Sequence, residues 1–127
     1  MAESRPFAYA VLRVVPCLER GEQLNVGVAL FCRQFDFLEL KVELNADRLK
    51  AIAPDADLEA IVSRLDGIRR VVEGDPAGGS LAKLEPSDRF GWLVAPSSTS
   101  IQASQAHTGL TSDPSAELER LFRTLVL

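Results

Sequence analysis

Polar residues interrupt an apolar stretch near the N-terminus of this 127-residue chain. Glu22, Asn25 and Gly27 lie close together in a run that otherwise suits a buried strand. A carboxylate can act as a general base and an amide can orient a ligand, so these side chains could contact a ligand at the end of a sheet. A structural role is the alternative, in which Gly27 marks a β-bulge whose backbone Asn25 hydrogen-bonds. Glu22 would then pair with Arg20 or with Arg13.

Two further side chains could join such a cluster. Arg13 lies within a predicted strand, where it could pair with an acidic residue of the third predicted strand or bind an anion. His107 is the only histidine and follows a segment rich in Ser, Thr and Gln. A histidine titrates near neutrality, although a lone surface histidine usually has no catalytic role. Together with Glu22 and Asn25, these residues would supply an anion anchor, a general base and a titratable donor.

Other motifs of known chemistry are missing from the sequence. The chain has no GxSxG, HExxH or EF-hand motif, and residues 78–80 lack the lysine and the spacing of a P-loop. Nothing in the spacing of its serines supports a Ser–His–Asp triad. Cys17 and Cys32 have no CxxC spacing, and two buried free thiols are favoured over a disulfide. We therefore predict no metal and no cofactor.

The overall charge narrows the classes of partner. The chain carries 18 acidic and 14 basic residues, for a net charge of −4. A broad nucleic-acid surface needs clustered Lys and Arg, so we expect none, and we expect Arg69 and Arg70 to lie on a solvated helix face. Residues 1–6 show no start of a signal peptide, and no run of about 20 apolar residues could span a membrane. We expect a cytoplasmic protein.

Three strands are expected in the first part of the chain, over residues 7–15, 24–32 and 37–44. In the first strand, one face is apolar throughout and is assigned to the core. The third strand alternates cleanly: Leu38, Leu40, Val42 and Leu44 point one way, and Phe37 and the charged residues Glu39, Lys41 and Glu43 point the other. Short connections predict an antiparallel meander with one face exposed to solvent.

Helices are expected in the remainder. Asn45 can cap a short helix that Pro54 ends, and Asp55 or Asp57 can cap a longer one that ends at Gly74. The longer helix has apolar residues at i, i+3, i+4 and i+7, namely Leu58, Ile61, Val62, Leu65, Ile68 and Val72.

Two more helices are expected further along, one capped by Ser87 and one starting at Asp113-Pro114. Residues 96–112 form either an ordered functional loop, with a weak strand near Ile101 and Ala103, or a partly flexible segment. The prediction is one α+β domain over residues 1–127. It has an antiparallel sheet of three or four strands, with helices packed mainly on one face.

Three short motifs follow one another in the first part of the chain: Leu12-Arg13-Val14-Val15-Pro16, Arg20-Gly21-Glu22 and Asn25-Val26-Gly27-Val28. They resemble the pattern of the bacterial family catalogued as domain of unknown function 3037. The stretch from Arg89 to Pro114, which includes Gln102 and His107, is similar to that family as well. The family has no assigned biochemistry. Its members are often encoded beside a HipA-like kinase-fold protein, which the resemblance implies as a partner.

We therefore expect an interaction or regulatory module that works with such a partner through the exposed sheet face and the loop of residues 97–109. The candidate cluster comprises Arg13, Arg20, Glu22, Asn25, Gln102 and His107. These residues meet only if the loop folds back over the end of the sheet. The alternative is a hydrolase or a nucleic-acid-processing enzyme that uses this cluster, and it needs His107 within about 10 Å of Glu22 or Arg13. A third hypothesis, an oligomeric scaffold, depends on the terminal helix.

Overall fold

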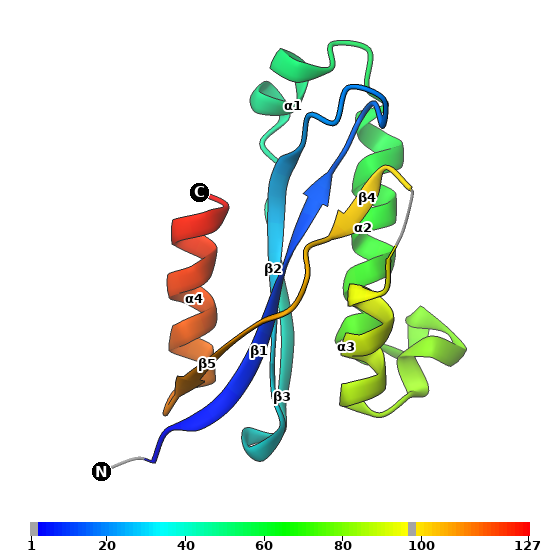
Figure 1. Cartoon of the computed structure of the whole chain (residues 1–127). Helices are drawn as coiled ribbons and strands as arrows, with labels where there is room; N and C mark the ends of the chain where they lie inside the picture. The colour runs from blue at the N-terminus through cyan, green and yellow to red at the C-terminus, as the bar shows by residue number, and fades with distance from the viewer. Residues whose placement is uncertain (1–2, 97–98) are drawn as a thin grey trace.

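The first part of the chain forms the predicted three-stranded meander. In the computed structural model, which describes residues 3–96 and 99–127, β1 (Arg5–Val14), β2 (Leu24–Cys32) and β3 (Phe37–Val42) pair antiparallel in the order β3-β2-β1 (Figure 1). A 3-10 turn, η1 (Arg33–Phe35), joins β2 to β3. It ends at Asp36, whose φ of 48° lies in the left-handed region.

Two further strands share the other edge of β1. β4 (Ile101–Ala103) pairs with residues 12–14 of β1, and β5 (His107–Thr111) pairs with residues 5–9. The sequence predicted β4 as a weak strand but assigned residues 107–109 to a loop, so β5 is a correction. The segment has little apolar alternation of its own, and it becomes a strand because the edge of β1 offers backbone groups that need partners.

Four α-helices are present in the part of the chain that the structure describes: α1 (Ala46–Ile52), α2 (Leu58–Val72), α3 (Pro86–Val94) and α4 (Pro114–Leu125). Asn45, Asp57 and Asp113 each accept a hydrogen bond from the backbone N–H three residues later, as their sequence positions predict. α3 begins at Pro86 instead of after Ser87, because proline suits the first helical position, where an N–H would have no partner. Two 3-10 turns, η2 (Pro76–Gly78) and η3 (Ser80–Lys83), join α2 to α3.

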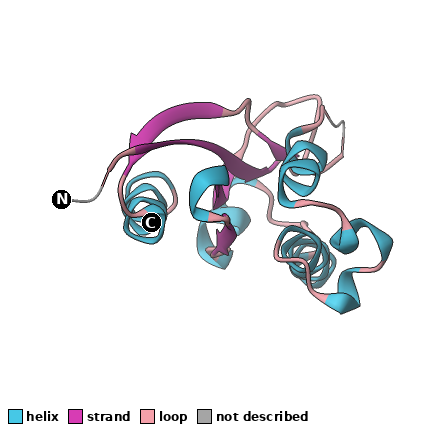
Figure 2. Ribbon diagram, turned by 90° about the horizontal axis from the view of Figure 1, so that it is seen from below, coloured by secondary structure: helices cyan, strands magenta, loops and turns pink. Residues whose placement is uncertain are grey.

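Helices cover both faces of the sheet. α1, α2 and α3 pack on one face over a large cluster that includes Leu12 and Ala29. On the opposite face α4 packs over a smaller cluster, whose buried members are Phe7, Val28, Leu30, Cys32, Leu118, Leu121 and Val126. Figures 1 and 2 show α4 and the α2–α3 pair on opposite sides of the strands.

The cover on the second face corrects one expectation. The sequence predicted that this face of the meander is solvated, and three of the four helices do lie on the other face. β2, however, is apolar on both faces, with Val28 and Leu30 alternating with Ala29 and Phe31. A strand with this pattern has to be covered on both sides.

Three further observations refine the sequence analysis. Cys17 and Cys32 are both free, but Cys17 is exposed in the β1–β2 connector, so the expectation of two buried thiols is wrong for it. Val62, expected on the apolar stripe of α2, is 49% exposed. Within residues 3–96 and 99–127, no helix has the length and apolar character needed to cross a bilayer.

Candidate functional site

The polar segment that precedes β2 leads into a β-bulge. Leu12 lies opposite Gly27, whereas Arg13 lies opposite Asn25, so Val26 is the extra residue in β2. A Cβ atom on Gly27 would lie 2.8 Å from the backbone carbonyl oxygen of Lys41, closer than real Cβ atoms come. The structural role predicted for Gly27 is thus confirmed.

The bulge allows neighbouring residues to face opposite sides of the sheet. Val26 is fully buried in the large cluster, on the face of the sheet that α1, α2 and α3 cover. Asn25 points to the other face, where its Nδ2 donates a hydrogen bond to the carbonyl oxygen of Leu125 at 3.0 Å. The last carbonyls of a helix have no partner within the helix, so Asn25 satisfies the end of α4. The backbone partner of Asn25 is therefore in α4 and not in the bulge itself.

A row of three polar side chains crosses the sheet at this point. Asn25 in β2, Arg13 in β1 and Gln102 in β4 lie in register, and we call them the Arg13 row. Nε of Arg13 donates to Oδ1 of Asn25 at 3.1 Å. Nε2 of Gln102 donates to the carbonyl oxygen of Thr99 at 2.9 Å. The structure therefore brings together three of the six candidate residues.

Arg13 forms no ion pair among the residues described here. The carboxylates of the third strand, Glu39 and Glu43, were possible partners for it. β2 lies between β1 and β3, so a direct cross-strand pair is not available to them. The described partner of Arg13 is the neutral amide of Asn25.

Arg20 and Glu22 form a separate pair in the connector. They are joined by a side-chain hydrogen bond and ion pair; Arg20 is largely exposed and Glu22 is half-buried. The hydrogen bond to Glu22, followed by its charge, raises the pKa of the Arg20 guanidinium. Of the two partners considered for Glu22, the structure selects Arg20. No described contact links this pair to the Arg13 row.

His107 lies further along the sheet, in β5. It is opposite Tyr9 in register, and the two rings approach with their centroids 5.2 Å apart. Tyr9 precedes Arg13 by four residues, which corresponds to about 13 Å along an extended strand. No described contact joins His107 to Glu22 or to Arg13.

Sequence reasoning missed two basic residues near α4. Arg48 of α1 donates to the carbonyl oxygen of Val126 at 3.2 Å, beside the group that Asn25 satisfies. Arg120 of α4 hydrogen-bonds Glu117, and this bond is the main cause of the raised pKa of the Arg120 guanidinium. The charge of the Tyr9 hydroxyl makes the smallest contribution to that rise. The i,i+3 spacing of Glu117 and Arg120 was a local signal for their pair. No local signal could have identified the contact of Arg48 with Val126, because the pairing of distant elements does not leave a short-range pattern.

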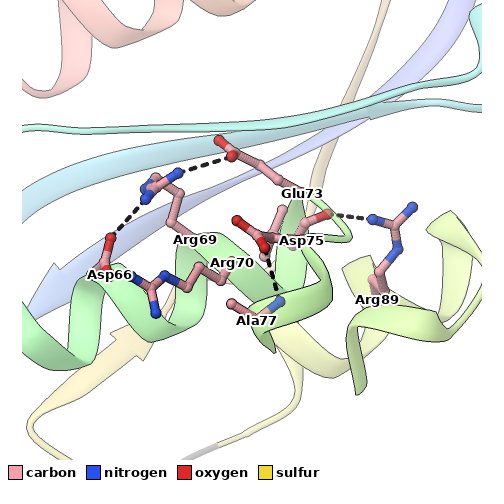
Figure 3. Close-up of polar contacts among 8 residues, drawn as sticks. Asp66, Arg69, Arg70, Glu73, Asp75, Ala77 and Arg89 are labelled. Atoms are coloured by element: carbon pink, nitrogen blue, oxygen red, sulfur yellow. Dashed lines mark hydrogen bonds and ion pairs between the residues drawn. The ribbon is translucent and has the colours of Figure 1, made fainter. Parts of the chain in front are cut away.

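The basic residues of α2 lie on a solvated face, as predicted. Arg69 donates to Asp66 at 2.7 Å and to Glu73 at 3.0 Å, and Arg70 pairs with Asp66 at 3.0 Å (Figure 3). The hydrogen bond from Arg69 is the main cause of the lowered pKa of Asp66. These cations are neutralised by their own helix and do not indicate a phosphate site.

Arg89 has a structural role at the end of α2. Its Nη1 donates to the carbonyl oxygen of Val72 at 2.9 Å, as Figure 3 shows. Its Nε is buried and has no hydrogen-bond partner among the described residues. Gly74, with φ of 73°, leaves room for this side chain, because a Cβ there would lie 2.4 Å from Nη1.

The described residues contain no group of three or more His, Cys, Asp or Glu side chains placed to hold a metal ion.

Comparison with known families gives one finding: the family model DUF3037, described as "Protein of unknown function", matches residues 9–126. No curated protein and no solved structure matches the chain.

Proposed function

Because the chain belongs to the DUF3037 family of proteins of unknown function, we propose its role from its own geometry: it is a protein-interaction module. The contact surface is the part of the sheet formed by β1, β4 and β5 on the side of α4. We call it the β1 polar face, and its members are Tyr9, Arg13, Gln102 and His107. Residues directly opposite in antiparallel strands share a face, so these four side chains are on the same side.

The observation that carries the proposal is the state of Arg13. Its side chain is half-buried, and its described hydrogen bond uses Nε and a neutral amide. The terminal guanidinium nitrogens have no described protein partner. A guanidinium presents its donors in a planar fork that matches a carboxylate, and such bidentate pairs are strong.

Asn25 prepares Arg13 for this contact. Asn25 is itself held by the carbonyl oxygen of Leu125, so it fixes the position of Nε. A side chain that is already ordered loses less conformational entropy when it binds. The aromatic rings of Tyr9 and His107, further along the same face of the sheet, add the kind of surface that is enriched at protein interfaces.

The partner is a protein that presents an aspartate or glutamate to Arg13. The family resemblance implies a HipA-like kinase-fold protein, and the module would act on it by binding. No described contact joins Glu22 or His107 to the Arg13 row, so no observation favours the hydrolase or nucleic-acid-processing alternative.

Titration calorimetry of the full chain with a HipA-like kinase-fold protein of the native host tests the proposal. We expect Arg13→Met to weaken binding by at least about tenfold, since truncating one side of a buried charge pair usually costs more than 2 kcal/mol. The matched control is Arg123→Met, on α4, whose side chain is largely exposed and pairs only at 3.7 Å with Glu119.

Wild-type affinity should also fall as salt is added. Thermal unfolding of both variants checks that they fold. Absence of binding by the wild-type chain, or equal losses from the two substitutions, would contradict the proposal.

A further inference from the structure

β3 is one open edge of the sheet, opposite the edge formed by β4 and β5. It ends the strand order, and no strand lies beyond it in the described part of the chain. The backbone N–H of Glu43, just after β3, donates to the carbonyl oxygen of Val26 at 2.7 Å. Because the direction of backbone groups alternates along a strand, those of Leu38, Leu40 and Val42 point away from β2. The edge thus offers a row of donors and acceptors that another strand could pair.

A largely apolar groove runs beside this edge on the side of α2. It has a volume of about 380 Å³ and is lined by Val42 and Leu44 near the edge and by Val62 and Leu65 of α2, together with the ion-paired side chains of Asp66 and Arg69. Val62 is half exposed there, although it belongs to the apolar stripe of the helix. Natural edges are commonly protected by proline, bulges or a covering element, and β3 contains no proline and pairs with β2 in unbroken register. A strand that docks on the edge would bring apolar surface against this groove.

We propose that the occupant is β3 of a second copy of the chain, paired antiparallel about a two-fold axis at Leu40. This register pairs residues 38–42 completely. Leu40 pairs with Leu40 of the other copy, and Leu38 pairs with Val42. These are the residues whose backbone groups point outward, so they fall in the hydrogen-bonded positions of the new ladder.

The charges of β3 complement one another in this register. Glu39 of each copy faces Lys41 of the other, in the non-hydrogen-bonded positions where opposite side chains are closest. Glu39 is exposed and has no described ion pair within its own chain. Lys41 is held on the same face by an ion pair with Glu119. The dimer contains two Glu39–Lys41 pairs, and its sheet is continuous across both copies.

Light scattering across a concentration series tests the dimer. We expect a mass that approaches twice the monomer value of 13.8 kDa as concentration rises. Glu39→Lys places Lys opposite Lys, and Lys41→Glu places Glu opposite Glu, so each should raise the dimer dissociation constant about tenfold. Glu19→Lys makes the same charge change in the β1–β2 connector and should leave the constant unchanged.

Mixing the two β3 variants sharpens the test. In a heterodimer of Glu39→Lys and Lys41→Glu chains, both cross-strand pairs are again of opposite charge, so dimers should return. A chain that stays monomeric up to about 1 mM, or a dimer that none of these changes affects, would overturn the proposal.

Cysteine cross-linking tests the register in a Cys17→Ser background. A mixture of Glu39→Cys and Lys41→Cys chains should form a disulfide-linked dimer, because their Cα atoms would lie about 4.5 Å apart. Neither variant alone should cross-link, since like positions are offset by two residues along the strand and lie more than about 7 Å apart. Efficient cross-linking of either variant alone would exclude this register.

Discussion

The two faces of the sheet are held by different kinds of contact. The large face is covered by α1, α2 and α3, which follow the meander in sequence and pack mainly through apolar side chains. The smaller face is covered by α4, which comes from the end of the chain. Its apolar cluster is supplemented by three polar contacts: Asn25 with Leu125, Arg48 with Val126 and Lys41 with Glu119.

This difference explains the polar motif that precedes β2. α4 is distant in sequence from the strands it covers, and the apolar patch beneath it is small. Hydrogen bonds and ion pairs at defined positions therefore help to fix its orientation. The hydrogen bond from Lys41 is the main cause of the lowered pKa of Glu119, and Asn25 satisfies the last turn of α4. The motif therefore has a structural task, and Arg13 is the charged member of its row, with terminal guanidinium nitrogens that have no described partner.

Cavity-forming substitutions should show whether the two faces contribute alike. Leu65 of α2 and Leu118 of α4 are both buried, one in each cluster. We expect Leu65→Ala and Leu118→Ala each to lower the free energy of unfolding by about 2–5 kcal/mol, because lost burial and a residual cavity add. Urea denaturation followed by circular dichroism measures both losses.

The matched control for this pair is Leu110→Ala in β5. Leu110 is 70% exposed, so its truncation should change stability by less than about 0.5 kcal/mol. A second transition in Leu118→Ala alone would show that α4 unfolds independently of the rest, and the two faces would then not form one cooperative unit.

A methyl group at the bulge should perturb both faces together. In Gly27→Ala the new Cβ meets backbone, not a flexible side chain, so we expect a loss of about 1–3 kcal/mol. The same substitution at Gly67, which is exposed in α2 with open space around it, should instead stabilise by about 0.5–1 kcal/mol. Thermal unfolding measures the change in stability of each variant. A change of the same sign in both would contradict the close approach at Gly27.

The smallest effect on stability is expected from a substitution in the charged surface of α2. The pKa of Asp66 is lowered in the folded chain, mainly by the hydrogen bond from Arg69. Its contribution to stability is therefore present above the unfolded aspartate pKa of about 3.9, and it is lost as the pH falls through the lower, folded pKa. Asp66→Asn should lower stability slightly at pH 7 and lose this effect in acid.

Urea denaturation of Asp66→Asn and wild-type chains at about pH 7, 5 and 3 checks the sign of this pH dependence. The control is Asp55→Asn, an exposed aspartate without an ion pair in the described structure, which should show no such trend. A deficit in Asp66→Asn that grows as the pH falls would contradict the assignment.

Features with local causes could be predicted from the sequence. The caps at Asn45, Asp57 and Asp113, the three strands of the meander and the short β4 all follow from nearby residues. β5 could not be predicted, because His107 to Thr111 become a strand only beside β1. The docking of α4 on the second face was also missed, although the apolar run of β2 carries the signal for it.

The sequence alone determined that something unusual happens between Glu22 and Val28. A glycine and an asparagine in an apolar strand indicate a bulge and an unsatisfied amide, because both requirements arise from adjacent residues. Only the tertiary structure decided which groups meet there. The partner of Asn25 is Leu125, 100 residues later, and the residue opposite Arg13 in β4 is Gln102. A local pattern can encode the need for a hydrogen bond, but the partner is supplied by an element that arrives only when the chain folds.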